Sequence, residues 1–148
     1  MKTKIFKITT GIAGGYHVLI AAAGLLLPPH LMAKVAEMAF GITFEMDPQL
    51  SVLAKFTSVY MLAFGVALIF LSRNPIKYRA FTWPALILFA IRFVTRVFFF
   101  STLATAGMPA SRNISGAVLI LGFFLALLIT MPKSDSEEGS DESAADTA

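Results

Sequence analysis

Four apolar segments, each long enough to cross a lipid bilayer, constrain this chain more than any other feature. They cover residues 8–27, 50–71, 84–105 and 114–131, and a helix needs about 20 apolar residues to cross the hydrocarbon core. Only 14% of the residues are charged, against about 25% in an ordinary soluble domain. The sequence therefore predicts an all-α integral membrane protein, a four-helix bundle formed by one domain of residues 1–132.

The distribution of Lys and Arg predicts the orientation of these spans. Two cations, Lys34 and Arg112, lie on one side of the predicted membrane. Seven lie on the other side: Lys2, Lys4, Lys7, Arg73, Lys77, Arg79 and Lys133. Cytoplasmic loops carry the excess of positive charge in membrane proteins, so both termini are expected in the cytoplasm. Because these cations flank apolar segments instead of forming one patch, nucleic-acid binding is not expected.

The first segment has an alternative interpretation as a signal peptide, because three lysines precede it and Ala21-Ala22-Ala23 resembles a cleavage site. The apolar run continues through Leu27, however, and it contains His17 and several glycines. We therefore favour a retained helix over a cleaved one.

Two segments outside the spans have patterns of their own. Apolar residues recur at helical spacing in residues 31–46, with charged residues on another face, which predicts an amphipathic helix on the outer membrane surface. Residues 133–148 hold six acids and one lysine. This low-complexity composition cannot bury apolar area, so it predicts a disordered, acidic cytoplasmic tail.

Five polar residues within the spans form the candidate site. Counting 1.5 Å per residue, His17, Tyr60 and Arg92 lie near mid-depth, about 12–15 Å from the ends of their spans, and Lys55 and Arg96 lie closer to the outer side. The only acids before the tail belong to the first outer loop: Glu37, Glu45 and Asp47. Because a charge inside a span costs about 3 kcal/mol, we expect these acids to fold over the outer end and form ion pairs with Arg96 and Lys55.

This arrangement has two interpretations. The ion pairs could serve only to hold the loop helix, or the cations could bind the anionic head of an amphiphile. On its stripe of small residues, His17 favours a helix–helix hydrogen bond over a role as ligand or base. Tyr60 is expected either to pack or to hydrogen-bond Arg92. The chain has no cysteine, no HExxH zinc motif and no second mid-membrane histidine for a bis-His haem, so no catalytic residue, metal or cofactor is predicted.

The order of the segments resembles a known family of small bacterial membrane proteins. The first span ends in GLLLPP, an amphipathic loop follows, and the second span reads KFTSVYMLAFGVALIFLSRNP before an Arg-bearing third span. Over about residues 8–131 the chain is similar to the BphX-like four-helix proteins and, more distantly, to the DoxX-like proteins. The resemblance implies the bacterial inner membrane. DoxX-like proteins are associated with respiratory or redox membrane complexes, which implies a quinone-related or accessory role. It supplies no catalytic residue.

Together these observations predict a non-enzymatic, accessory or ligand-binding membrane protein. Its site would comprise His17, Lys55, Tyr60, Arg92 and Arg96, and its ligand would be a lipid, a fatty acid or a quinone. Membrane lipids, a membrane protein or a second copy of the chain are the expected partners. The alternatives are a membrane enzyme that uses His17 as acid or base on a lipophilic substrate, and a small transporter. Four spans without a repeat or a broken helix argue against the transporter.

Overall fold

A computed structural model describes residues 2–43, 45 and 47–132 of the chain. The predicted acidic tail, residues 133–148, lies outside these described residues. The elements in chain order are α1 (Lys2–Leu26), α2 (Pro29–Phe40), α3 (Pro48–Arg73), the 3-10 helix η1 (Arg79–Phe81), α4 (Thr82–Phe98), α5 (Phe100–Thr105) and α6 (Ala110–Thr130). The described chain is all-α, as predicted.

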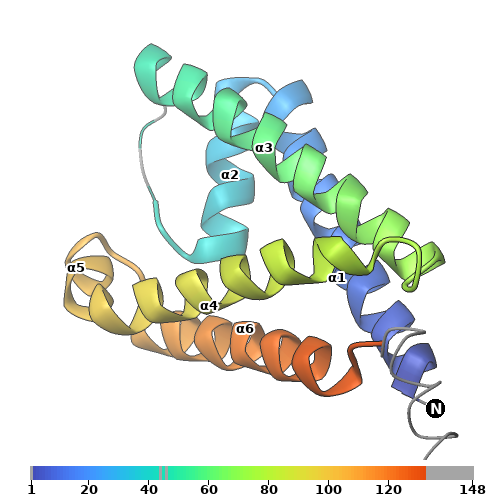
Figure 1. Ribbon diagram of the computed structural model, residues 1–148. Helices are drawn as coiled ribbons and strands as arrows, with labels where there is room; N and C mark the ends of the chain where they lie inside the picture. The colour runs from blue at the N-terminus through green and yellow to red at the C-terminus, as the bar shows by residue number, and fades with distance from the viewer. Residues whose placement is uncertain (1, 44, 46, 133–148) are drawn as a thin grey trace, which may run out of the picture.

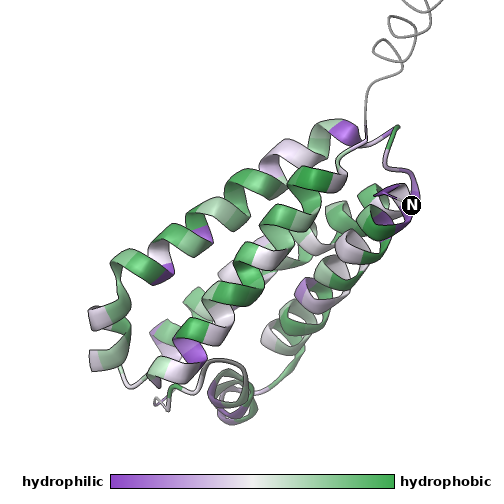
Figure 2. Ribbon diagram, turned by 90° about the horizontal axis from the view of Figure 1, so that it is seen from below, coloured by the Kyte–Doolittle hydropathy of each residue, from purple (hydrophilic) through white to green (hydrophobic). Residues whose placement is uncertain are grey.

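Four of these segments are long and apolar enough to cross a membrane: Lys2–Leu26, Pro48–Arg73, Arg79–Phe98 and Ala110–Thr130. Figure 2 shows hydrophobic positions along most of each long helix and hydrophilic ones at isolated points and at the ends. The apolar surface of such helices faces lipid without cost, whereas it would be unfavourable in water. The chain is therefore a multi-pass membrane protein with a four-helix bundle.

The ends of the helices follow from local chemistry. Pro29 stands in the first turn of α2, and α2 stops at Gly41, whose φ of 72° suits a residue without a side chain. The Asp47 carboxylate caps α3 by accepting a hydrogen bond from the Leu50 amide at 2.7 Å. The interfacial helix predicted over residues 31–46 is therefore shorter. It begins earlier, at Pro29, and it ends at Phe40 because the left-handed turn at Gly41 stops it.

The long helices associate as two antiparallel pairs. In the first pair, α1 and α3, the backbones approach so closely that a Cβ on Gly14 would lie 2.8 Å from the Gly65 carbonyl oxygen. In the second pair, α4 and α6, the rings of Phe89 and Phe123 stack with centroids 5.9 Å apart. The pairs share one core of buried side chains: Phe6, Ala13, Leu68, Leu71, Ala85, Leu86, Phe89 and Leu127.

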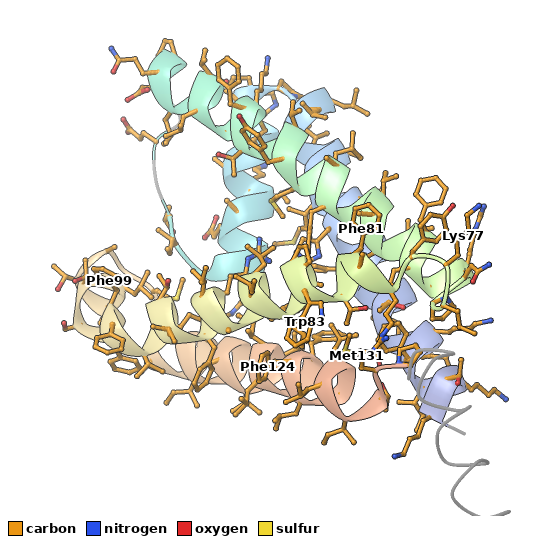
Figure 3. All side chains as sticks on the ribbon, in the orientation of Figure 1. Lys77, Phe81, Trp83, Phe99, Phe124 and Met131 are labelled. Carbon is orange, nitrogen blue, oxygen red and sulfur yellow. The ribbon has the colours of Figure 1, made fainter. Side chains whose placement is uncertain are left out.

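The two pairs converge at one end of the molecule and diverge at the other (Figure 1). Lys77 marks the convergent end, in the connection between α3 and η1, and Phe99 marks the opposite end (Figure 3). At the divergent end α2 runs crosswise from the α1/α3 pair toward the α4/α6 pair (Figure 1). It is held there by Arg112 at the start of α6, whose Nη1 donates to the Met38 carbonyl oxygen of α2.

The third span differs from the continuous helix predicted over residues 84–105. It stops at Phe98, and the short helix α5 follows after Phe99, whose backbone has φ −98° and ψ 23°. No proline or glycine marks this point, so the break could not be predicted from the residues around it. The break shortens the third span on the side where the pairs diverge, and it places Arg96 in the last turn of α4.

Candidate intramembrane arginine site

His17 lies on the face of α1 that turns into the bundle. Its side chain is only 3% exposed, and the rings of Phe64 and Phe89 stand edge-on to it with centroids 5.1 Å and 6.4 Å away. Its Nδ1 lies 2.7 Å from the carbonyl oxygen of Ala13, one turn earlier in the same helix. Aromatic packing and the backbone carbonyl together fix the orientation of the imidazole.

The other ring nitrogen joins the two helix pairs. Nε2 of His17 lies 2.7 Å from Nη1 of Arg92 on α4. A guanidinium can only donate hydrogen bonds, so Nε2 must accept and carries no proton. The proton of a neutral imidazole is then on Nδ1, where it is donated to the Ala13 carbonyl. The imidazole is neutral in this arrangement, and both of its nitrogens are engaged. This confirms the prediction of a helix–helix hydrogen bond.

Among the described residues, no acidic side chain compensates the positive charge of Arg92. Arg92 is half-buried, and no carboxylate in the described ranges lies within the 4.0 Å that defines an ion pair with it. Its partner His17 is neutral, so it offers a hydrogen bond without a countercharge. Arg92 lies six residues before the end of its span at Phe98, or about 9 Å below that end. An unpaired cation at this depth is costly.

Arg96, one turn further along α4, contacts α6 instead of α1. Its Nη1 donates to the side-chain oxygen of Asn113 on α6 at 3.1 Å and lies 3.8 Å from the sulfur of Met108. The Asn113 amide donates in return to the Arg96 carbonyl oxygen at 3.4 Å. Beneath the guanidinium lies Gly116, where a Cβ would come within 2.7 Å of Nη1. The absence of a side chain there makes room for the guanidinium.

The acids of the first outer loop do not take the positions that the sequence suggested. Glu37 accepts a hydrogen bond from Thr43 at 3.3 Å, and Asp47 is used as the cap of α3. Across the part of the chain that the structure describes, no ion pair joins Glu37, Glu45 or Asp47 to Arg96 or Lys55. The structure thus corrects the expectation that these acids form ion pairs with Arg96 and Lys55. The physical reason is local: Asn113 reaches Arg96 from the adjacent helix, whereas Glu37 on α2 and Glu45 and Asp47 before α3 are exposed.

The structure brings together only part of the predicted site. His17 and Arg92 are in direct contact, and Arg96 follows one turn later on α4. Tyr60 is 75% exposed and Lys55 is also exposed. Tyr60 therefore points away from the bundle, and the hydrogen bond to Arg92 that was expected of Tyr60 is formed by His17. Because lipid surrounds α3, the Lys55 side chain can extend toward the membrane surface while its methylene groups stay in apolar surroundings.

Sequence reasoning missed Asn113 as a functional residue. The side chain is in fact 2% exposed and binds Arg96. One signal in the sequence could have identified Asn113. It is a polar residue in the first turn of its span, at the same depth as Arg96 in the preceding antiparallel span.

Comparison with known proteins adds no relative: no family model, curated protein or solved structure matches the chain. Among the described residues, no group of three His, Asp or Glu side chains is placed to hold a metal ion. The class that the fold and the spans define is that of a multi-pass α-helical membrane protein. Inside it, His17 contacts Arg92 and Asn113 contacts Arg96 through hydrogen bonds between helices.

Proposed function

We propose that this protein is a non-enzymatic, accessory or ligand-binding membrane protein, and that its four-helix domain binds an amphiphilic anion at Arg92. The observation that carries the proposal is the 2.7 Å contact between Arg92 and a neutral His17. This contact fixes the guanidinium inside a span and leaves its charge uncompensated among the described residues. An anionic group that reached Arg92 would relieve that cost, because buried charges are stable only when they are paired.

The chemistry of Arg92 limits the ligand. A guanidinium has five N–H donors in one plane, and the contact to His17 uses only one nitrogen of the three. The remaining donors suit a carboxylate or a phosphate, which accept two parallel hydrogen bonds from arginine. Apolar helices surround the position, so the rest of the ligand must be lipophilic. A fatty acid or an anionic lipid has both an anionic acceptor group and a lipophilic body. A quinone is lipophilic and its carbonyl oxygen accepts hydrogen bonds, but it carries no negative charge.

The arrangement of His17 argues against the enzyme alternative. A general acid or base needs a ring nitrogen that can reach the substrate. Here Nδ1 is bound to the Ala13 carbonyl and Nε2 to Arg92, and the ring is 3% exposed. His17 would have to break a contact before it could exchange a proton with a substrate. Its role in the proposal is to position the guanidinium.

The orientation and the family remain parts of the proposal. We place the protein in the bacterial inner membrane with both termini in the cytoplasm, on the strength of the lysines and arginines that flank the spans. The convergent end of the bundle would then face the cytoplasm, and α2 would lie at the outer surface. The resemblance to BphX-like proteins agrees with this placement and stays a prediction.

Native mass spectrometry of the full chain, extracted in a mild detergent, tests the proposal. We expect an anionic amphiphile to co-purify, and Arg92→Gln to reduce its occupancy about tenfold, since a charge-assisted hydrogen bond is lost. Arg73→Gln, at the exposed end of α3, is the matched control and should retain it. If Arg92→Gln folds with the wild-type thermal stability and keeps the same amphiphile at the same occupancy, the proposal is wrong.

A further inference from the structure

A groove between α4 and α6 lies apart from the contact between Arg92 and His17. Its volume is about 460 Å³. Side chains of α4 and α6, together with Phe100 at the start of α5, line it, and all but two of them are apolar. The apolar ones that matter most are Phe93, Val97, Phe100, Ile114, Val118 and Leu121, and the polar ones are Arg96 and Asn113. Arg92 does not line the groove, because it is directed to α1 through His17.

The surface of the groove is almost wholly apolar, and its two polar lining residues, Arg96 and Asn113, lie together at one end, which we call the polar end. The third span ends at Phe98, so Arg96 lies about 3 Å inside that end, at the level where lipid headgroups begin. Asn113 belongs to the first turn of α6 and lies beside Arg96. From Asn113 the lining continues along α6 to Leu121, about 12 Å further into the membrane. A ligand that matched this groove would have a polar head at the surface and a hydrocarbon chain pointing inward.

The guanidinium at the polar end is held ready for an anion. Asn113 fixes one of its nitrogens, and the missing side chain at Gly116 gives it room to lie against α6. These neighbours are neutral, and across residues 2–43, 45 and 47–132 no carboxylate forms an ion pair with Arg96. The charge is therefore oriented without being neutralised.

We propose that this groove is a binding site for an anionic phospholipid of the surrounding bilayer, with the lipid phosphate on Arg96 and one acyl chain along α4 and α6. Charge complementarity and depth select this occupant. The phosphate of a bilayer lipid lies at the level of Arg96, and its acyl chain runs in the direction of the groove. The site differs from the one proposed at Arg92, which lies one turn deeper on α4 and contacts His17 of α1 instead of Asn113 of α6.

The site predicts a preference between two lipids that share a phosphate and can carry identical acyl chains but differ in the net charge of the headgroup. The experiment measures binding of phosphatidylglycerol and phosphatidylcholine, with identical acyl chains, to the full chain by native mass spectrometry in a mild detergent. We expect phosphatidylglycerol to be retained several-fold more than phosphatidylcholine. Arg96→Gln should remove this preference and lower the retention of phosphatidylglycerol several-fold, to the level of phosphatidylcholine.

A second variant tests the groove without changing the charge. Val118 lies on the groove and is 65% exposed, so Val118→Trp fills the groove without entering the bundle core. It should lower the retention of both lipids several-fold. Ile87→Trp, at an exposed position of α4 outside the groove, is the matched control and should bind as the wild type does.

Two results would overturn the inference. One is equal retention of the two lipids by the wild-type protein, and the other is unchanged retention of phosphatidylglycerol in Arg96→Gln or Val118→Trp. The Arg92→Gln variant keeps this test separate from that of the proposed function, because it should lose the amphiphile of the deeper site and keep phosphatidylglycerol in the groove.

Discussion

The two helix pairs of this protein are built by different means. In the α1/α3 pair, glycine faces glycine, and Gly14 and Gly65 bring the two backbones into direct contact. In the α4/α6 pair, larger side chains meet, and polar groups such as Arg96 and Asn113 bond across the pair at one end. Helices in lipid associate by close packing and interhelical hydrogen bonds, since lipid solvates apolar side chains as well as a neighbouring helix does.

The difference shows which pair is a scaffold and which carries the chemistry. A contact between backbones leaves no room for a ligand and cannot be adjusted. The side-chain contacts of the α4/α6 pair leave a groove on its surface and direct Arg92 and Arg96 to two different neighbours. The hydrogen bond between His17 of α1 and Arg92 of α4 adds a polar link between the two pairs, which also share a core of apolar side chains.

Breaking the α1/α3 pair should have the largest effect on stability. In Gly14→Val the new side chain would meet the backbone of α3 at Gly65 and the side chain of Ile69. A backbone cannot move aside, so we expect a loss of about 3 kcal/mol in the free energy of unfolding. Equilibrium unfolding in mixed detergent micelles measures this change.

Gly15 provides the control for that experiment, because no atom lies within 4 Å of a Cβ placed there. Gly15→Val should change the free energy of unfolding by less than about 1 kcal/mol. If the two valine variants unfold alike, the close approach of α1 and α3 does not stabilise the bundle, and the contrast between the pairs fails.

Weakening the α4/α6 pair should have a smaller effect. Asn113→Ala removes the acceptor of the Arg96 guanidinium and the return bond to the Arg96 carbonyl, and we expect a loss of about 1.5 kcal/mol. The same unfolding measurement applies. Ser115→Ala, which removes only an exposed local bond to the Arg112 carbonyl, is the control. A loss as large as that of Gly14→Val would mean that the second pair is held as rigidly as the first.

The spans and their order could be predicted from the sequence because hydrophobicity over about 20 residues is a local property. Hydropathy placed all four spans, and helical spacing identified α2. The end of α2 was missed because the left-handed turn at Gly41 was not recognised as a helix stop. The break at Phe99 could not be predicted, since no residue there disfavours a helix.

The contents of the site were predicted only in part. Depth along each span put His17 and Arg92 at the same level, and the structure joins them. Depth does not tell which way a side chain points around the helix axis, so Tyr60 was placed in the site although it is 75% exposed. Asn113 was overlooked because its partner lies on another helix. Such contacts depend on how the helices are rotated against each other, which a single sequence does not specify.

The protonation of His17 tests the central claim most directly. The chain has two histidines, so His30→Gln leaves His17 as the only imidazole, and nitrogen-15 magnetic resonance of the labelled protein in lipid at neutral pH can report on each ring nitrogen. We expect a neutral ring with its proton on Nδ1 and an unprotonated Nε2 that accepts a hydrogen bond from Arg92. An imidazolium, or a proton on Nε2, would contradict it, because the ring then could not hold the guanidinium.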